Sequence, residues 1–539
     1  MNHTLPPLFD ASGPEFQWQI PERFNIGTAI SDDWAARDAD RICLETFKLD
    51  GPHQHLTYGQ LSDRSSALAG HLLRLGHQTG QRIAILLPQS FETAISHTAI
   101  YKMGGVALPL ALLFGPDALS YRLKDAGASA LITNRFGYEK LVAIRDQLAD
   151  LQTIILTDGG VAGTESFSAL TDPAAIRFEA RDTRADDPAL MIYTSGTTGP
   201  PKGALHAHRV LPGHIPGISM AHENMPQPGD KFWTPSDWAW AGGLLNCLLP
   251  GLLLGVPVVA SPAQKFDPDM AFRLMTEMQV RNAFIPPTAL RLMKSVKDPL
   301  KTYDLRLRTL GSAGESLGRE TYEWAKATLG LTVNEFYGQT ECNFVLSNSA
   351  RTGITRSGSM GKPVPGHQVA ILRPDGSEAA KGETGQVAIK APDPAMFLQY
   401  WNNPSATETK FLNGWMLTGD QGTMDEDGYF FFFGRDDDVI TSSGYRIGPG
   451  EVEDCLLSHP DVQLAAVIGK PDPVRTEIVK AFIVLKHDVV ASADMAADIQ
   501  DWVKSRLSMH EYPREIEFVA DLPLTTTGKV IRRLLRDRG

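Results

Sequence analysis

Between Tyr193 and Gly203 the sequence Tyr-Thr-Ser-Gly-Thr-Thr-Gly-Pro-Pro-Lys-Gly sets hydroxyl residues and glycines ahead of a lysine. Glycines let backbone N–H groups close on phosphate oxygens, hydroxyls add donors, and Lys202 supplies a positive charge. The segment therefore predicts a polyphosphate-binding loop. It does not have Walker A spacing, because Pro-Pro separates Gly199 from Lys202. Taken alone, an ordinary glycine-rich turn is the alternative.

A second segment, Glu335-Phe-Tyr-Gly-Gln-Thr-Glu341, follows the apolar stretch Leu331–Val333. An aromatic ring beside a glycine can present its face to a planar base, and Glu341 could meet a hydrated Mg²⁺. The competing interpretation is a turn at a strand end with a core tyrosine.

Three further segments carry charge next to glycine. Gly414–Asp420 places a carboxylate at a glycine corner, which suits two vicinal hydroxyls, although an aspartate bonded to its own backbone is equally consistent. Segment 435–446 joins an arginine, an acidic run, Gly444 and a second arginine, and could equally be a solvated linker. Lys529 follows a threonine- and glycine-rich turn that could swing it into a site, or it is part of a basic terminus.

The composition limits the class of protein. The chain has 539 residues, 42% hydrophobic and 21% charged, which predicts a folded protein with at least two domains. A net charge of −12 argues against a nucleic-acid or anionic-membrane surface. Its four cysteines are far apart, so we expect no zinc site or disulfide framework and a cytoplasmic location. We see no signal peptide and no integral membrane span, since prolines and glycines interrupt the apolar stretch Leu244–Ala260.

Alternating apolar runs and helical stretches predict an α/β fold with a mostly parallel sheet covered on both faces. Expected strands are Arg82–Leu87, Ala107–Leu110, Ala130–Thr133, Thr153–Leu156, Val256–Ala260 and Asn282–Ile285. The helix Phe91–Met103 is expected between the first two. Residues 361–400 predict a small antiparallel β unit, with strands Val369–Leu372 and Gln386–Ile389. Residues 435–539 predict a smaller, mobile α+β domain after a large domain of αβα layers spanning residues 1–434.

Together, these segments resemble the acyl-adenylate-forming superfamily of AMP-binding enzymes, and most closely its medium-chain and acetyl-CoA synthetase-like acyl-CoA synthetases. The resemblance runs from about Tyr58 to Lys529 with five motifs in the family order. It implies that a carboxylate attacks the α-phosphate of ATP, giving acyl-AMP and pyrophosphate, and that the CoA thiol then displaces AMP.

The resemblance also implies roles for residues. Thr340, Glu341 and Lys529 would be catalytic, with Glu341 placing Mg²⁺ and Lys529 bridging the carboxylate and the α-phosphate. ATP or AMP would be bound by Thr194, Ser195, Gly196, Thr197, Thr198, Gly199, Lys202, Gly314, Glu315, Ser316, Glu335, Phe336, Tyr337, Gly338, Gln339, Thr340, Asp420, Arg435 and Lys529. The hinge of the rotating C-terminal domain would be Asp437. CoA would meet Ser443, Gly444, Tyr445, Arg446, Arg475, Arg506 and Tyr512.

The acyl pocket would be lined by Trp240, Ala241, Gly242, Ala313 and Gly338. Acetate-selective relatives carry tryptophan where Gly338 stands, so the resemblance predicts a deeper pocket that takes a medium-chain or aryl-substituted acid. Four extra buried methylenes would favour hexanoate over acetate by about 3 kcal/mol, roughly two orders of magnitude. The partners would be this acid, ATP and CoA, in a monomer or small homo-oligomer. Alternatives are an enzyme that loads a carrier protein, a luciferase-like oxygenase and a non-catalytic nucleotide-binding regulator.

Overall fold

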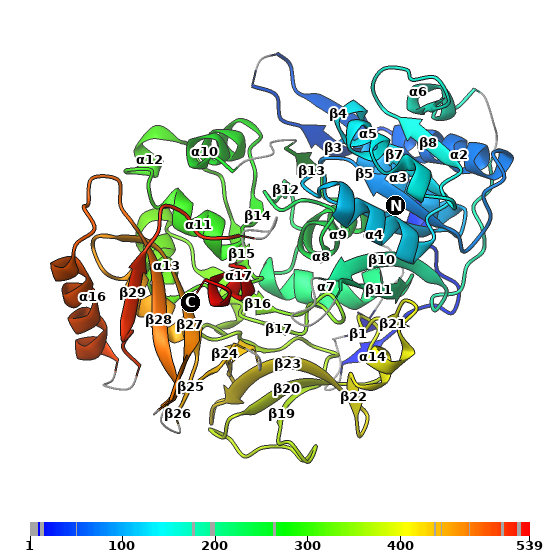
Figure 1. Cartoon of the computed structure of the whole chain (residues 1–539). Helices are drawn as coiled ribbons and strands as arrows, with labels where there is room; N and C mark the ends of the chain where they lie inside the picture. Colours follow the sequence, from blue (N-terminus) through cyan, green and yellow to red (C-terminus); the bar gives the residue numbers. More distant parts are fainter. Residues whose placement is uncertain are drawn as a thin grey trace.

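The structure is a computed structural model that describes residues 9–10, 16–49, 51–174, 178–194, 200–261, 266–435, 438–442, 445–473, 475–507, 511–524 and 530–538. Two large sheets with helices around them form the bulk of the molecule, and two smaller sheets follow in the chain (Figure 1). Within those ranges no helix has the length and apolar character needed to cross a bilayer.

The first large sheet has eight strands in the order β21-β11-β10-β6-β5-β7-β8-β9. From β10 to β9 all neighbours are parallel, whereas β11 and β21 add antiparallel strands at one edge. The strands are β5 (Arg82–Leu86), β6 (Val106–Pro109), β7 (Ala130–Thr133), β8 (Thr153–Leu156), β9 (Glu165–Ser166), β10 (Pro188–Thr194), β11 (Lys202–Ala207) and β21 (Gln399–Tyr400). The four strands predicted here are confirmed to within one residue at either end.

The second large sheet has nine strands in the order β18-β17-β16-β15-β14-β12-β13-β3-β4, parallel from β16 to β3. The strands are β3 (Ile42–Thr46), β4 (Gln54–Thr57), β12 (Phe232–Trp233), β13 (Val258–Ala260), β14 (Asn282–Phe284), β15 (Thr309–Ser312), β16 (Val333–Tyr337), β17 (Leu346–Ser347) and β18 (Lys362–Pro363).

Two predicted boundaries on this sheet were wrong. The strand expected at Val256–Ala260 begins two residues later, because Gly255 closes the preceding helix in a left-handed conformation at φ +70°. Glu335 to Tyr337 were expected in a turn after a strand, but they form the strand end itself. Glu335 and Phe336 are buried and Tyr337 is partly exposed, as expected where a strand leaves the core, and the turn begins at Gly338.

Alternate strand residues serve two different cores, as the period of two requires. On β5, Ile83 and Ile85 face a central helical layer, whereas Ala84 and Leu86 face the outer helices. The central layer also takes side chains from the nine-stranded sheet, so both sheets share one core. Helices that contribute to it include α2 (Tyr58–Arg74), α3 (Phe91–Lys102), α7 (Val210–Ala221) and α9 (Leu249–Leu254). Helix α3 confirms the helix expected at Phe91–Met103.

Further helices cover the outer faces or connect strands. They are α1 (Asp33–Ala35), α4 (Pro116–Ala126), α5 (Arg135–Val142), α6 (Phe167–Leu170), α8 (Ala241–Gly243), α10 (Pro268–Glu277), α11 (Pro287–Met293), α12 (Pro299–Thr302), α13 (Arg319–Trp324) and α14 (Pro404–Glu408). Three π-helical turns are η1 (Thr28–Asp32), η3 (Leu244–Leu248) and η4 (Ala325–Leu329), and the 3₁₀ turns are η2 (Arg145–Gln147) and η5 (Ala350–Thr352).

The predicted antiparallel β unit is confirmed and extends further than expected. Its strands are β19 (Val369–Leu372), β20 (Gly385–Lys390), β22 (Phe411–Leu412), β23 (Trp415–Met424) and β24 (Phe430–Arg435). Strand β23 carries a bulge against β20, where Gly419 takes φ +78°. The glycine corner expected beside Asp420 is this bulge.

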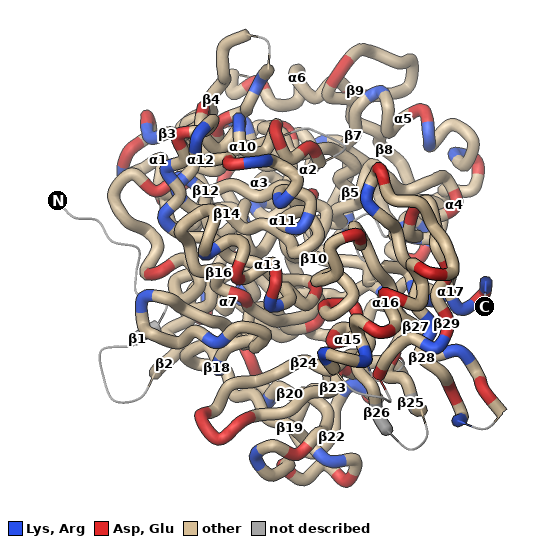
Figure 2. The backbone as a smooth tube through the Cα atoms, turned by 90° about the vertical axis from the view of Figure 1, so that its left-hand side faces the viewer, with Lys and Arg blue, Asp and Glu red and all other residues tan. Residues whose placement is uncertain are grey.

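The last unit has its own five-stranded sheet and hydrophobic core. Its elements are β25 (Ile440–Ser442), β26 (Tyr445–Ile447), α15 (Pro449–Leu457), β27 (Val462–Asp472), β28 (Thr476–Leu485), α16 (Ala493–Arg506), β29 (Glu515–Phe518) and α17 (Arg532–Arg536). The short strands β1 (Phe9–Asp10) and β2 (Gln17–Trp18) pair near the N-terminus. Lys and Arg are interspersed with Asp and Glu over all of these units (Figure 2).

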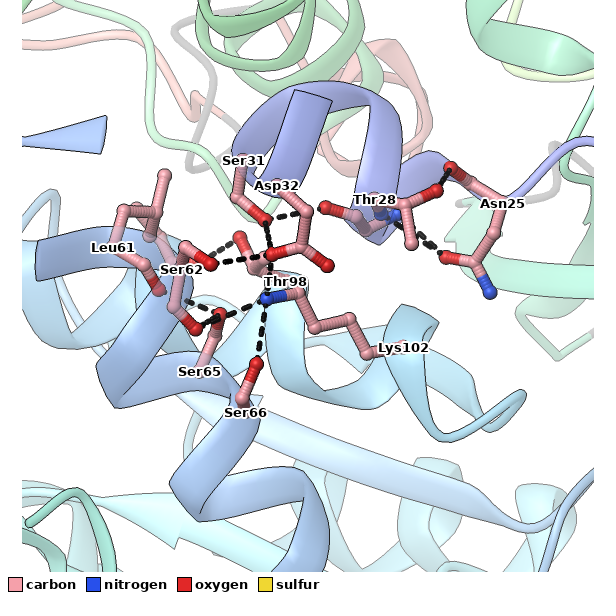
Figure 3. Close-up of polar contacts among 12 residues, drawn as sticks. Asn25, Thr28, Ser31, Asp32, Leu61, Ser62, Ser65, Ser66, Thr98 and Lys102 are labelled. Carbon is pink, nitrogen blue, oxygen red and sulfur yellow. Dashed lines mark hydrogen bonds and ion pairs between the residues drawn. The ribbon is translucent and has the colours of Figure 1, made fainter. Parts of the chain in front are cut away.

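A buried ion pair joins the start of the chain to the central layer (Figure 3). The Lys102 ammonium at the end of α3 is fully buried and lies 2.5 Å from Asp32 Oδ1. It also donates to the Ser62 carbonyl and the Ser66 hydroxyl, while the Ser62 hydroxyl donates to Asp32. All three ammonium protons therefore have acceptors, which makes burial of this charge tolerable.

We expect Asp32→Ala to destabilise the protein by about 3–5 kcal/mol, because it leaves the Lys102 ammonium buried without its counter-charge. The double variant Asp32→Ala/Lys102→Met removes both charges and should recover much of that loss. Urea unfolding of the wild type, both single variants Asp32→Ala and Lys102→Met, and the double variant measures the difference. A double variant as unstable as the sum of both single changes would contradict the ion-pair explanation.

Candidate active site

Four side chains, from β16, the turn after it and the small antiparallel sheet, meet at the end of β16. Tyr337 Oη donates to Asp420 Oδ2 at 2.5 Å, and Gln339 Nε2 donates to the same oxygen at 2.7 Å. Arg435 pairs with Asp420 across β23 and β24, and its Nε lies 3.7 Å from Asp420 Oδ1. Burial raises the pKa of Asp420, whereas Arg435 and the two donors oppose that shift. A buried carboxylate is thus held at a fixed position beside a partly exposed aromatic ring.

A second carboxylate lies behind the next turn. Glu341 is buried, and its Oε1 accepts a hydrogen bond from Tyr400 Oη at 2.5 Å. Tyr400 belongs to β21, which pairs with β11, and the Lys202 ammonium lies 5.3 Å from the Tyr400 ring centre. Thr340, partly exposed, directly precedes Glu341 in the chain. Tyr400 was missed in the sequence because its contact spans 59 residues and belongs to no local motif.

The predicted phosphate loop has two described ends. Thr194 ends β10 and pairs with Lys202, the first residue of β11. The two strands are antiparallel neighbours, and the glycine- and hydroxyl-rich segment connects them along the chain. Ser195, Gly196, Thr197, Thr198 and Gly199 lie outside the described residues, as do Asp437, Ser443, Gly444 and Lys529.

A further cation near these groups was not predicted. Lys410 donates from Nζ to the carbonyls of Leu417 at 3.0 Å and Thr418 at 3.2 Å, next to the bulge that carries Asp420. Burial lowers its pKa, and the nearby carboxylates Glu341 and Asp420 oppose that shift. Lysine at this position gave no signal in the sequence because no glycine or hydroxyl motif surrounds it.

Two side chains of α11 anchor the loop after β15. Glu315 accepts from Thr288 Oγ1 at 2.8 Å and lies 3.3 Å from Arg291 Nη1. Arg291 also donates to the Ser316 carbonyl at 2.7 Å. Gly314 is exposed at the turn with φ +103°. Since β15 and β16 are parallel, this loop and Tyr337 lie at the same carboxyl edge of the sheet, where α/β proteins bind ligands.

The buried Glu335 and the partly buried Asp454 link this loop to the C-terminal unit. Glu335 Oε1 accepts from the Leu317 N–H at 3.1 Å. Asp454 of α15 packs against Gly318, where an added Cβ would lie 2.5 Å from Asp454 Oδ1. Burial raises the pKa of Glu335 to about 8 and that of Asp454 to about 7. The Asp454 charge further raises the pKa of Glu335, whereas Arg291 lowers the pKa of both groups.

The residues predicted to meet CoA are described only in part. The backbones of Tyr445 and Arg446 form β26 opposite β25. Arg475 lies in the turn next to Thr476, which pairs with Ser442 of β25. Arg506 stacks on the Trp502 ring at 3.2 Å, while Tyr512 receives a hydrogen bond from Arg514. The structure therefore places Arg475 beside the β25–β26 hairpin and Arg506 at the end of α16.

The predicted acyl-pocket residues form part of an aromatic wall. Trp240, Ala241 and Gly242 are half-buried, and Ala313 is buried. An added Cβ on Gly242 would lie 3.3 Å from the Phe284 ring.

A polar side chain lies next to Gly338, where the sequence predicts a deeper pocket. An added Cβ there would lie 2.4 Å from Asn343 Oδ1, so an amide side chain takes up the space next to this glycine. Asn343 was missed because it lies two residues past the motif that drew attention to Gly338.

Both the sequence and the fold of this chain are similar to those of known proteins. Residues 31–401 match the family model of the AMP-binding enzymes, and residues 451–529 match the model of the AMP-binding enzyme C-terminal domain. The chain belongs to the AMP-binding enzyme family. Its class within that family is the AMP-forming carboxylate–CoA ligases, which are ATP-dependent acid–thiol ligases.

Several relatives of this AMP-binding enzyme cover nearly the whole chain. An uncharacterised acyl–CoA ligase of Bacillus subtilis is 34% identical over 96% of this chain and 96% of its own length. The mitochondrial acyl-coenzyme A synthetase ACSM4 of Rattus norvegicus is 32% identical over 96% of this chain and 91% of its own. An anthranilate CoA ligase in complex with anthranoyl-AMP superimposes with a TM-score of 0.89 at 28% identity, covering 96% of this chain and 98% of its own. A benzoate CoA ligase from Burkholderia xenovorans has a TM-score of 0.85 at 28% identity, covering 95% and 100%.

The raised pKa values at the loop predict a pH dependence of stability. The unfolded chain ionises Glu335 near its ordinary value of about 4.5, but the folded chain keeps it protonated to about pH 8. Folding therefore becomes less favourable as pH rises between these values, by up to about 1.4 kcal/mol per pH unit for one carboxyl. We expect Glu335→Gln, which keeps the acceptor for Leu317, to flatten the fall in thermal midpoint between pH 5 and 9.

The matched control is Glu426→Gln, because the Glu426 side chain is 85% exposed and should leave the wild-type slope unchanged. Equal slopes for the wild type and Glu335→Gln would show that this carboxyl does not titrate as its burial requires.

Proposed function

We propose that this ligase activates a medium-chain or aryl-substituted carboxylic acid to acyl-AMP and transfers the acyl group to CoA. The observation that carries the proposal is the junction of Tyr337 with Asp420 at the end of β16, beside Glu341 and Lys202, which both contact Tyr400. Loading of a carrier protein is the alternative, because it shares the adenylation step.

The geometry supports separate roles for the two carboxylates. Asp420 is fixed by Tyr337 and Gln339, so it can accept from two vicinal ribose hydroxyls without reorganising, with Arg435 helping. Tyr337 and the loop Gly314–Ser316 would frame the adenine. We assign the buried Glu335 and Phe336 to the support of this site, since neither lies at the exposed end of β16.

Glu341 fits a Mg²⁺ ion carried by ATP. Mg²⁺ keeps several waters and takes one or two carboxylates besides substrate phosphates. Among the described residues no three His, Cys, Asp or Glu side chains form a metal cage, so a single carboxylate is the fitting donor set. One Glu341 oxygen accepts from Tyr400, which orients the carboxylate, and Thr340 beside it would touch the α-phosphate. Bound there, the ion would neutralise phosphate charge.

Two anions must meet in adenylation, so fixed cations have to offset their repulsion. Lys202 and the segment that begins at Thr194 would hold the outer phosphates. Lys529 would bridge the two reacting groups. In the second step, Gly444 and its neighbours would let the pantetheine arm pass after the C-terminal domain has turned about Asp437.

The domain limits belong to this proposal. We place the adenylation domain at residues 1–434 and the mobile domain at 435–539, and the two family models, which end at 401 and begin at 451, are compatible with that limit. Asp438, next to the proposed hinge, is held by Arg536 of α17 at 2.6 Å. We also propose a cytoplasmic enzyme, since all four cysteines are buried free thiols, acting as a monomer or small homo-oligomer.

The function is tested by CoA-dependent AMP release with acetate, butyrate, hexanoate, octanoate, decanoate, benzoate and phenylacetate. We expect AMP and acyl-CoA with a medium-chain or aryl acid, and a specificity constant for hexanoate well above that for acetate. Pyrophosphate without a CoA thioester would favour carrier-protein loading. A higher specificity constant for acetate than for hexanoate, octanoate and phenylacetate would overturn the substrate class.

The two half-reactions should separate by mutation. Lys529→Ala should lower pyrophosphate formation about 10²–10³-fold, as expected for loss of one stabilising donor at a developing charge. Gly444→Leu should spare that step but block thioester formation, because a side chain would fill the proposed pantetheine path. Pyrophosphate exchange and acyl-CoA yield measure the two steps. A Gly444→Leu variant that forms acyl-CoA at the wild-type rate would refute the proposed path.

A further inference from the structure

We propose that the amide pair Asn246–Asn343 sets the acyl specificity of this ligase and selects aromatic acids with a hydrogen-bonding ring substituent. The inference rests on the proposed function and narrows its substrate class. It places a polar group that can form a hydrogen bond with the substrate beside Gly338, where the sequence predicts a deeper pocket.

The pair is buried and only half used. Asn343 Nδ2 donates to Asn246 Oδ1 at 2.6 Å, and the two residues are 6% and 3% exposed. Within the described part of the chain, Asn343 Oδ1 and Asn246 Nδ2 have no hydrogen-bond partner. If both amides were turned over, one carbonyl oxygen and one NH₂ group would still be unused. Neither atom is among the fully buried polar atoms that lack a partner, so both keep some contact with solvent and can be reached by a ligand that supplies a donor or an acceptor.

The free oxygen faces the position that the acyl-pocket prediction singled out. It lies where a Cβ on Gly338 would come within 2.4 Å, in the turn between β16 and β17. Asn246 approaches from η3, the π-helical turn that directly follows the half-buried wall residues Ala241 and Gly242. π-Helical turns interrupt ordinary helices mostly at functional sites. The two amides therefore join the strand end that carries the site to the predicted acyl wall.

Packing around a strained neighbour fixes the position of Asn343. The next residue, Phe344, takes φ +108°, a region that residues with a side chain rarely adopt. Its ring stacks on Phe336, with centroids 3.9 Å apart and planes at 16°. The space for that ring exists because residue 217 is glycine, where an added Cβ would lie 2.3 Å from the Phe344 ring. Packing thus over-determines the conformation that presents Asn343.

The surrounding wall favours a flat acid. The Phe284 ring is tilted by 44° against Phe336 with ring centres 5.3 Å apart, and Phe336 in turn stacks on Phe344. Gly242 brings backbone, without a side chain, to the Phe284 ring. Aromatic rings and glycines make a narrow apolar surface that suits a planar ring. The amide pair is the polar group within this surface, so it provides the means to discriminate one substituted ring from another.

The test compares benzoate with its hydroxy- and amino-substituted forms in the ATP- and CoA-dependent reaction of the full chain. The readout is the ratio of kcat/KM for the best substituted acid to that for benzoate, which cancels any loss of folded enzyme or of adenylation. We expect a wild-type ratio of about tenfold or more, since a hydrogen-bonding site discriminates against the analogue that leaves it unpaired. In Asn343→Leu the ratio should fall to about one.

Two further variants keep the test decisive. Asn246→Leu/Asn343→Leu replaces both amides by apolar groups of similar size, which avoids a single unpaired amide, and its ratio should also fall to about one. Asn413→Gly, in an exposed turn with φ +50°, should keep the wild-type ratio. A wild-type ratio near one, or an unchanged ratio in both leucine variants, overturns the inference while leaving the ligase function intact. Failure of every benzoate while a medium-chain acid still releases AMP also overturns the inference, whereas failure of the medium-chain acids as well overturns the proposed function itself.

Discussion

The hydrogen bond from Tyr337 to Asp420 is the contact on which the site depends. It joins the last residue of a strand in the nine-stranded sheet to a bulge in the small antiparallel sheet, 83 residues later in the chain. Gln339 also donates to this carboxylate oxygen, so two hydrogen bonds fix the turn after β16 against the small sheet. Every other group of the site lies on one side or the other of this junction. The small sheet is therefore a structural part of the site and not an appendage to it.

Burial of charge shapes the rest of the region. Glu335, Asp420 and Asp454 all have raised pKa values because protein replaces water around them. The chain has more acidic than basic residues, 63 against 51, so positive charge has to be concentrated where phosphates would bind. Arg291 and Lys410 supply it from beneath the loops, while Lys202 supplies it at their rim. This is consistent with a polyanion-binding site in an acidic protein.

Much of the fold could be predicted from the sequence, because buried parallel strands are short apolar runs such as Ala130–Thr133. Motif residues such as Asp420 and Glu341 could be predicted because their spacing is local. Tyr400, Lys410 and the Asn246–Asn343 pair could not, since each is defined by a contact between segments far apart in the chain. The continuation of β16 through Glu335–Tyr337 was not predicted, because its pairing with β15 and β17 cannot be seen in the local sequence. The roles of Lys529 and Gly444 stay predictions, because both residues lie outside the described part of the chain.

The packing of Phe344 against Gly217 has a consequence for how this enzyme can change. Residue 217 cannot gain a side chain while the ring is present, and a smaller residue at 344 would leave a void between Gly217 and Phe336. The two positions are therefore epistatic: neither can be exchanged alone without loss of fit, although a paired exchange conserves volume. Laboratory evolution by single substitutions would therefore recover few variants at these two positions, whereas a library that varies both positions together would recover more.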